Sequence, residues 1–423
     1  MFGSARAATP RAGRTATWLV IVAWCLLAIG ASSHEGEYTP FALVCVVAGV
    51  LLLGGVVASG TALIAPSRPM IGVAAGVSFV AAIVHPVYRY MHAHDLHLVQ
   101  SLAAASATVA FATLAVRTRR GLWWAGAAIA AASGITIVMV SDPHIDVWYL
   151  LQQSSDGLLR GDDMYRQHWA HSHGLQAVYP YLPLTTVALA PFRWLFGDVR
   201  AGLLLASLMT SAQLRRLAPA APVALALLVL VYPHWAFVVD QSWTEPLVLL
   251  LLTTALIAIE RDRSRVAVVA LALALATKQH VVLVLPLFAV WPRFGWRRAL
   301  VAAGLAFVFV LPWIVAGPSD FWHDAVHANL ALGVLRRGLT IPSLLARHGI
   351  RVGFWLPVTA LVAGYAVIVK RAPRTTAGLA LSSALVLWVL DVTNKQSFFN
   401  HYTLPLGLIV VALAAASTAP TDA

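Results

Sequence analysis

The chain has 423 residues, of which 60% are hydrophobic and 11% are charged, and its mean hydropathy is +0.79. Soluble proteins average about 25% charged residues, and one soluble core of this size cannot enclose so much apolar surface. The composition therefore excludes an ordinary soluble protein and indicates a polytopic membrane protein. The net charge of +12 does not indicate a nucleic-acid partner, because the basic residues are scattered between apolar runs as in cytoplasmic loops. The two cysteines, Cys25 and Cys45, lie in apolar runs, so neither a disulfide framework nor a thiolate metal site is expected.

The first apolar run, residues 18–31, follows Arg6, Arg11 and Arg14 and precedes no clear cleavage pattern. We interpret it as a retained first span with a cytoplasmic N-terminus. Three more spans are predicted over residues 41–65, 71–87 and 99–116. Residues 1–120 are therefore predicted to form a four-span N-terminal region of unknown role.

A fifth span, residues 123–140, leads into a polar and aromatic segment, residues 142–181, which lies outside by this threading. The segment is too long for a passive connection. It holds five aspartates and four histidines: Asp142, Asp146, Asp156, Asp162, Asp163, His144, His168, His171 and His173. The spacing of the last three histidines could hold a metal. Because no fixed carboxylate partner accompanies them, neither a divalent metal nor another cofactor is expected.

The rest of the chain alternates between apolar runs and short basic loops. The run at 183–213 is interrupted by Pro191 and by a basic patch from Arg193 to Arg200, so one half is expected to be interfacial or re-entrant. The run at 266–290 is expected to dip toward the outer face and return. Further spans are predicted over 223–239, 247–259, 300–315, 354–369, 378–390 and 404–415. The prediction is an all-α transmembrane bundle of about 12 to 13 spans, with both termini cytoplasmic because most of the 29 Lys and Arg fall on that side.

Two carboxylates stand at the outer mouth of the fifth span, Asp142 and Asp146, beside Trp148 and Tyr149. Partial desolvation beside aromatic rings raises a carboxyl pKa and suits a general base. The alternative is a solvated loop acid or a helix cap, since aspartate is common at both.

A series of short elements follows these acids. Residues 147–159 fit an interfacial amphipathic helix, although Gly157 weakens that prediction. Gly161, Tyr165 and a Tyr-Pro element at 179–183 come next. This order resembles the GT-C superfamily of membrane glycosyltransferases. It is most similar to the polyprenol-phosphate-mannose-dependent mannosyltransferases of actinobacterial envelopes and to the catalytic subunit of the first GPI mannosyltransferase.

The resemblance covers residues 121–423, the predicted catalytic module, and implies a GT-C-like bundle with interfacial helices in the outer loop after the fifth span. It implies that Asp146 is the catalytic base, with Asp142 as the alternative. An apolar span interrupted by Lys278 and a late outer loop at 395–402 also match the family. The first four spans depart from the usual pattern, in which the acid follows the first span.

Several polar residues are candidates for contact with a donor phosphate. An intramembrane lysine such as Lys278 is costly and indicates function, unless it snorkels to an interface. Cationic hydrogen bonds to phosphate are strong, and Gln279 and His280 extend the polar site. A similar cluster, which could also be an ordinary polar loop, consists of Lys395, Gln396, Asn400, His401 and Tyr402. Arg160 is a further candidate for a phosphate or a lipid headgroup, and equally for plain surface.

The hydroxyl groups of the acceptor sugar need hydrogen-bonding residues other than the cations predicted for the donor phosphate. Asp240 and Glu245 flank Trp243 in an outer turn, and Tyr165 follows the interfacial helix. We predict that these three residues, Asp240, Glu245 and Tyr165, contact the acceptor. The alternative for the two acids is simple solvation.

The first hypothesis is an inverting hexosyltransferase in the plasma membrane with its active site on the outer face. Its partners would be a polyprenyl-phosphate sugar, with mannose expected, an envelope glycolipid or lipoglycan acceptor, and membrane lipids. No nucleotide is expected, since no Gly-rich phosphate loop stands out. A transporter or flippase of lipid-linked sugars and a non-catalytic scaffold for envelope assembly are the alternatives.

Overall fold

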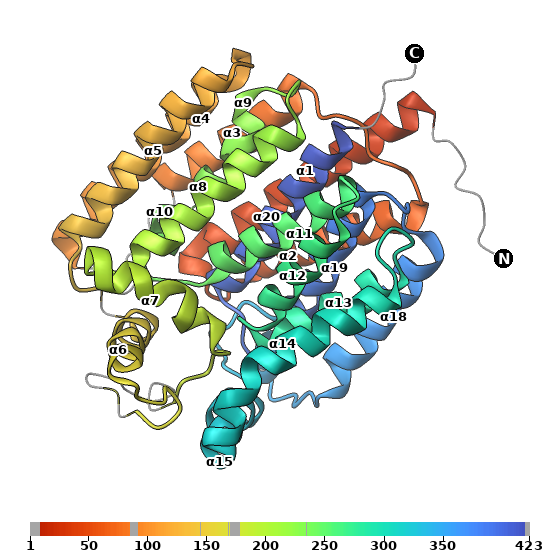
Figure 1. Cartoon of the computed structure of the whole chain (residues 1–423). Coiled ribbons are helices and arrows are strands. Elements are labelled where there is room, and N and C mark those ends of the chain that lie inside the picture. Colours follow the sequence, from red (N-terminus) through yellow and green to blue (C-terminus); the bar gives the residue numbers. More distant parts are fainter. Residues whose placement is uncertain are drawn as a thin grey trace.

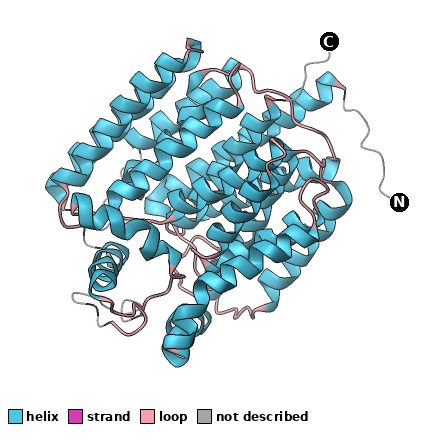
Figure 2. Cartoon of the chain, viewed as in Figure 1, coloured by secondary structure: helices cyan, strands magenta, loops and turns pink. Residues whose placement is uncertain are grey.

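The computed structural model describes residues 9–84, 92–143, 145–167, 169, 178–233 and 235–418. Every regular element among these residues is helical, and none of the described residues lies in a strand (Figure 2). This confirms the predicted all-α fold. The elements up to the polar outer segment are α1 (Pro10–Ser32), η1 (Ser33–Gly36), α2 (Pro40–Ser59), α3 (Arg68–Val84), α4 (Ala93–Ala112), η2 (Thr113–Ala115), α5 (Arg119–Met139) and α6 (Asp146–Arg160).

Fourteen further α-helices and the short η4 and η5 segments are described after α6. The middle of the chain forms α7 (Leu184–Phe196), α8 (Arg200–Leu217), α9 (Val223–Val231), α10 (Trp235–Asp240), α11 (Glu245–Glu260), α12 (Ser264–Leu275), η4 (Gln279–Val284) and α13 (Leu285–Val290). The last part forms α14 (Trp296–Ala316), α15 (Pro318–Phe321), η5 (Trp322–His327), α16 (Ala328–Ala331), α17 (Ile341–Arg347), α18 (Trp355–Arg371), α19 (Thr376–Thr393) and α20 (Phe399–Ala416).

The chain is an integral membrane protein by the length and composition of its helices. Among the described residues, seven helices are long and apolar enough to cross a membrane, namely those at Pro10–Gly36, Pro40–Ser59, His94–Ala115, Arg119–Met139, Trp296–Ala316, Thr376–Thr393 and Phe399–Ala416. The bent pair of α7 and α8 would make an eighth. This is fewer than the 12 to 13 spans predicted, because α3 and α18 have only 17 residues each and the chain between α8 and α14 is divided into still shorter helices. The longest of these, α11, has 16 residues.

The centre of the bundle is built from its C-terminal helices. The apolar windows of α19 and α20 are each 89% buried, whereas those of α5 and α14 are 22% buried. Helix α20 packs against α19, α11, α1, α9 and α8, and Figure 1 shows α4 and α5 on one side of this core and α14 and α18 on the other. A helix that is apolar all round is buried within protein or faces lipid. The sparsely covered faces of α5 and α14 are therefore the lipid-facing ones.

The N-terminal helices are part of the same core. Helix α1 packs against α20 and α2 against α19, and the indole N–H of Trp24 donates to the Leu406 carbonyl at 3.2 Å. A Cβ atom on Gly49 of α2 would lie 2.5 Å from the Trp388 ring of α19, so glycine permits this close approach. The role of residues 1–120 as a separate region stays a prediction.

The helix pair that leads out of the polar outer segment is sharply bent. Helices α7 and α8 meet at 113°. The break lies at Gly197, whose φ of +78° suits glycine because other residues rarely adopt it. The predicted interruption is therefore confirmed, although Pro191 lies inside α7 and does not end it.

A second break occurs in the predicted dip, where α12 ends at Leu275 and Lys278 is extended with φ −140° and ψ 137°. Backbone carbonyls freed by such a break need donors from elsewhere in the protein, since lipid offers none. Ala276 and Thr277 receive three hydrogen bonds from the start of α7, donated by Leu182 N, Leu184 N and Thr185 Oγ1 at 3.1, 3.2 and 2.8 Å. The Tyr-Pro element and the Lys278 break are thus fixed to each other.

One buried arginine joins four helices at the same end of the bundle. Arg200, the first residue of α8, pairs with Asp240 of α10 at 3.0 Å and with Asp198 at 2.7 Å. It also donates to the Ile137 carbonyl of α5 at 3.0 Å. The indole N–H of Trp148 on α6 donates to Asp198 at 3.3 Å. We call Arg200, Asp198, Asp240 and Trp148 the Arg200 node.

We expect Arg200→Ala to destabilise the fold strongly. The Asp240 side chain is 0% exposed, and removing the cation leaves a buried carboxylate with only an amide partner, which costs about 3–5 kcal/mol. Arg160→Ala breaks the exposed Arg160–Asp162 pair and should cost under about 1 kcal/mol. Denaturation in detergent micelles measures both. Equal losses of stability would contradict the structural role of the node.

Candidate active site

Asp146 is the first residue of α6 and is half-buried at the mouth of the bundle. Its Oδ1 accepts a hydrogen bond from the Val147 N–H at 2.9 Å. Burial raises the pKa of the Asp146 carboxyl above its ordinary value, although backbone hydrogen bonds partly oppose this. The environment therefore suits a general base at a pH where an ordinary aspartate would be a poor one.

Asp142 lies close by but in a different environment. It is exposed, and its Oδ1 accepts from the Tyr149 hydroxyl at 2.7 Å. Burial, together with this contact, raises the pKa of Tyr149 to about 12, so the phenol keeps its proton and remains a donor. The structure thus brings both predicted acids to the N-terminal turn of α6 and gives the desolvated position to Asp146.

Lys278 is paired across the bundle with Glu245, the first residue of α11. Their Nζ and Oε1 atoms are 2.7 Å apart, and the two side chains are 10% and 3% exposed. The Tyr181 ring lies 5.6 Å from the ammonium, and the Asn400 amide approaches Glu245 Oε1 at 3.5 Å. The second carboxylate oxygen, Glu245 Oε2, is buried without a hydrogen-bond partner among the described residues.

Tyr181 connects this ion pair to the candidate base. Its phenol lies close enough to Asp146 and Glu245 for their charges to act on it, and burial is the main reason why its pKa is well above the ordinary value. His401 lies close enough to Lys278 and Glu245 for their charges to act on its imidazole ring. His280 lies close enough to Lys278 for the same effect. The site therefore joins six side chains from distant parts of the sequence: Asp146, Tyr181, Glu245, Lys278, His280 and His401.

Glu245 has an ion-pair partner that the sequence did not indicate, and its contact with the acceptor stays a prediction. The sequence suggested acceptor contact, but the structure places this carboxylate on the ammonium of Lys278. The pairing has a physical reason, because a buried ammonium without a counter-ion is strongly unfavourable. The preceding turn holds Ser242 at φ +56°, a strained conformation for a non-glycine residue, so the entry to α11 is held by its surroundings.

Three predicted contact residues instead hold the backbone together. The side-chain NH2 group of Gln279 donates two hydrogen bonds, to the Pro180 carbonyl at 3.0 Å and to the Ala325 carbonyl at 2.7 Å. The Tyr165 hydroxyl donates to the Tyr181 carbonyl at 2.8 Å. Tyr402 is fully buried and donates to the Leu339 carbonyl at 2.5 Å. Irregular segments leave carbonyls that need donors, and these side chains supply them.

The remaining predicted residues lie away from Lys278 or are engaged elsewhere. Asp240 is enclosed in the Arg200 node, where its Oδ2 also accepts from Gln241 at 2.6 Å. The Lys395 ammonium donates to the Leu330 carbonyl at 2.8 Å. Arg160 pairs with Asp162 at the far end of α6, about 20 Å along the helix from Asp146 at 1.5 Å per residue. The role of Arg160 at a phosphate or lipid headgroup stays a prediction.

The predicted histidine cluster is not placed. His144, His168, His171 and His173 lie outside the described residues. Within the part of the chain that the structure describes, no group of three or more His, Cys, Asp or Glu side chains is arranged to hold a metal ion. Cys25 and Cys45 are free and buried.

Two acids that the sequence did not single out lie around the site. Asp324 accepts a hydrogen bond from the Tyr179 N–H at 2.8 Å, so it orients the Tyr-Pro element, and its Oδ1 lies 2.8 Å from His323 Nδ1. It stands in the π-helical turn η5, which leaves no sequence signal. Asp391, 5% exposed near the end of α19, interacts electrostatically with Glu245 and Lys278. An acid at the end of an apolar span could have been recognised as an intramembrane charge.

Comparisons with known proteins leave the family open. No protein-family model and no curated protein matches the sequence. A similar solved structure is the crystal structure of ArnT from Cupriavidus metallidurans bound to undecaprenyl phosphate, with 16% identity and a TM-score of 0.48. The match covers 71% of this chain and 60% of that one. At this level of similarity it identifies neither the family nor the activity of this chain.

A double-mutant cycle tests the central ion pair. Glu245→Gln leaves a buried ammonium without its counter-ion and Lys278→Met leaves a buried carboxylate, so each should destabilise the protein by about 3–5 kcal/mol. The double variant removes both charges and should lose less than either single variant. Denaturation in detergent measures all four proteins. Additive losses would show that the two residues do not interact.

Proposed function

We propose that this chain is a GT-C-type membrane glycosyltransferase that moves a sugar, with mannose expected, from a polyprenyl-phosphate donor to an envelope glycolipid or lipoglycan. The observation that carries the proposal is that a desolvated carboxylate, Asp146, and a buried cation, Lys278, both lie near one side chain, Tyr181. A base and a phosphate-binding cation on opposite sides of one reacting carbon are what transfer from a sugar phosphate requires.

Asp146 is the proposed base. It takes the proton of an acceptor hydroxyl as that oxygen forms a bond to the anomeric carbon of the donor sugar. The bond from that carbon to the phosphate oxygen breaks at the same time, and its electron pair leaves with the polyprenyl phosphate. Attack opposite the leaving group inverts the anomeric centre. The half-buried position of Asp146 supports this role, because desolvation makes its carboxylate a stronger base.

Lys278 is the proposed partner of the leaving phosphate. An ammonium has three N–H donors, and Glu245 occupies one of them. The remaining donors can neutralise charge that grows on the phosphate during bond breaking, where preorganised cations are most effective. His401 supports the same role, since its Nδ1 accepts from the Phe398 N–H at 3.3 Å, so that in the neutral ring Nε2 carries the proton.

The surrounding hydrogen bonds support a preorganised site. Gln279 ties the carbonyls of Pro180 and Ala325 together next to Lys278. Tyr165 holds the backbone of Tyr181. Side chains that are fixed in advance lower the cost of reaching the transition state. We therefore assign Gln279 and Tyr165 positioning roles and reserve direct contact for Asp146, Lys278 and His401.

The proposal places the active site on the outer membrane face and both termini in the cytoplasm, as the distribution of basic residues predicts. Transfer from a phosphate-linked donor needs no nucleotide, and the expectation that it needs no metal stays a prediction. The helices of residues 1–120 would pack against the catalytic module through α19 and α20.

A flippase of lipid-linked sugars is the second candidate. It is favoured by the broken stretch α12–η4–α13 with a buried ion pair at its break, since discontinuous helices with charged residues are typical of transporters. A flippase would move a lipid-linked sugar between leaflets of a vesicle without forming a new glycosidic bond.

The first test is transfer of radiolabelled mannose from polyprenyl-phosphate-mannose into membrane lipids. We expect Asp146→Asn to lower the rate by about 10²–10⁴-fold, the usual contribution of a general base. Asp142→Asn serves as the matched control at the exposed position and should retain most of the rate. A rate that survives in Asp146→Asn would remove this residue from the reaction. Movement of labelled lipid without transfer would support the flippase.

The pH dependence of transfer gives a second test. The base must be ionised, so the rate should fall as the pH is lowered through the Asp146 pKa, which burial raises. The acid limb should therefore lie above about 4, the ordinary value for aspartate. Rates at saturating donor between pH 3.5 and 8, with circular dichroism as a check of folding, provide the measurement. A limb at or below the ordinary value would argue against a desolvated base.

A further inference from the structure

One face of α6 carries a continuous row of polar side chains. Asp146, Tyr149, Gln153, Asp156 and Arg160 follow one another at intervals of three and four residues. This spacing places them on a single helix face. The opposite face, which includes Leu151 and Ser155, is buried. We call the row the α6 polar face, and it extends about 20 Å from the candidate base.

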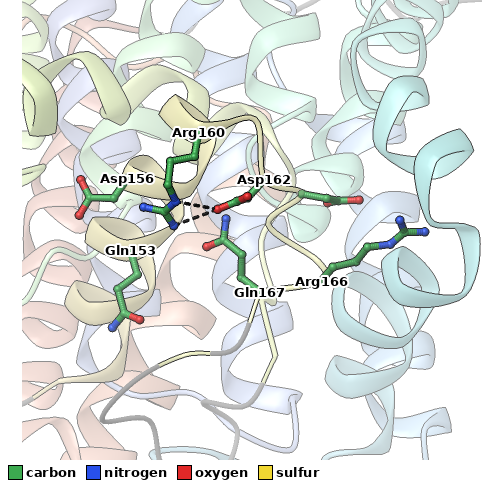
Figure 3. Close-up of a pocket in the computed structure, with 7 residues that line it drawn as sticks. Gln153, Asp156, Arg160, Asp162, Arg166 and Gln167 are labelled. Atoms are coloured by element: carbon green, nitrogen blue, oxygen red, sulfur yellow. Dashed lines mark hydrogen bonds and ion pairs between the residues drawn. The ribbon is translucent and has the colours of Figure 1, made fainter.

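The α6 polar face ends in a pocket of about 470 Å³. Figure 3 shows this pocket beside the C-terminal turns of α6. Seven side chains line it, all of them polar: Gln153, Asp156, Arg160, Asp162, Asp163, Arg166 and Gln167. Three of these belong to the α6 polar face as well. The candidate base and the pocket are thus connected by one continuous polar surface.

Each cation around this pocket is already paired with a carboxylate. Arg160 pairs with Asp162 at 2.9 Å. Asp156 receives two hydrogen bonds of 2.9 Å from Arg193. Arg166 pairs with Asp320 at 2.8 Å. An anionic ligand such as a phosphate needs uncompensated cations. The pocket therefore suits a neutral ligand that forms many hydrogen bonds.

Two hydrogen-bonding atoms at the pocket have no partner among the described residues. They are the carboxylate oxygen Asp163 Oδ2 and the amide nitrogen Gln167 Nε2, one an acceptor and one a donor. A sugar hydroxyl both donates and accepts, so it can satisfy either atom. The Gln167 amide lies only 1.8 Å from where a Cβ atom would stand at Gly157. The glycine inside α6 therefore makes room for Gln167 at the pocket.

We propose that the α6 polar face and its pocket bind an extended neutral oligosaccharide acceptor. The reacting sugar lies at Asp146, the ring of Tyr149 and the amide of Gln153 contact the next sugars, and the pocket holds a more distant one. This inference rests on the proposed function and deepens it, because it names the acceptor class as a chain of several sugars. It also gives roles to Tyr149, Gln153, Gln167 and Gly157.

Binding of manno-oligosaccharides of one to four residues to the full chain in detergent micelles tests the inference. Isothermal titration and saturation-transfer NMR need neither donor nor reaction. We expect the affinity to rise with length by more than about tenfold from monosaccharide to tetrasaccharide, since the longer ligand makes additional hydrogen bonds. Equal affinity for all lengths, or no binding of the tetrasaccharide, would overturn the inference.

Two substitutions locate the binding. Gln153→Ala removes an amide from the α6 polar face, and Gly157→Ala pushes the Gln167 side chain out of place while favouring the helix. Each should reduce the preference for the tetrasaccharide by about fivefold to tenfold. Gln100→Ala on α4, another glutamine with a hydrogen-bonded side chain, is the matched control and should keep the preference. An unchanged preference in both pocket variants would place the oligosaccharide elsewhere and overturn the inference.

The outcome for this inference is separable from that for the proposed function. Length-dependent binding without mannose transfer would support the α6 polar face and contradict the transferase. Transfer without length-dependent binding would support the transferase and contradict the α6 polar face.

Discussion

The absence of water inside a bilayer is the constraint from which most of this structure follows. Each backbone carbonyl freed by a helix break, and each charge below the surface, must find a partner within the protein. The carbonyls freed at the Lys278 break therefore accept hydrogen bonds from the segment at the start of α7, and Gln279 beside the break donates to Pro180 and Ala325. At the other break, the Gly197 carbonyl accepts from Arg193. The same constraint pairs Lys278 with Glu245 and gathers Asp198 and Asp240 around Arg200.

These compensating contacts also position the proposed chemistry. The Arg200 node fixes α6 through Trp148, close to the start of the helix at Asp146. On the other side, Gln279 fixes the Lys278 break to Pro180, one residue before Tyr181. A base at the start of α6 and a cation at the break after α12 are thereby both held near one tyrosine. The energetic cost of burying charge is met by pairing, and the result is a rigid site that does not have to assemble around its substrate.

Helix α6 differs from the rest of the bundle in having two distinct sides. One side of the helix packs against α7, whereas the α6 polar face begins at the candidate base and ends in a pocket whose cations are each paired with a carboxylate. A transferase acting on a polymeric acceptor needs a surface that guides the acceptor to the base, and a helix lying beside the bundle offers one (Figure 1). The lipid-linked donor would approach from the opposite direction, through the apolar helices around Lys278.

The sequence by itself determined the membrane class, the all-α fold, the amphipathic helix after the fifth span and the two interrupted runs, because hydrophobic period, length and turn residues are local properties. It also located Asp146 and Lys278 as unusual charges. It could not determine which charges meet. Glu245 pairs with Lys278, Asp240 with Arg200, and Tyr402 with the Leu339 carbonyl only because segments distant in sequence pack together. Ion pairs and hydrogen bonds to backbone carbonyls depend on that packing. Only the tertiary structure therefore decided which polar residues remain free for substrate.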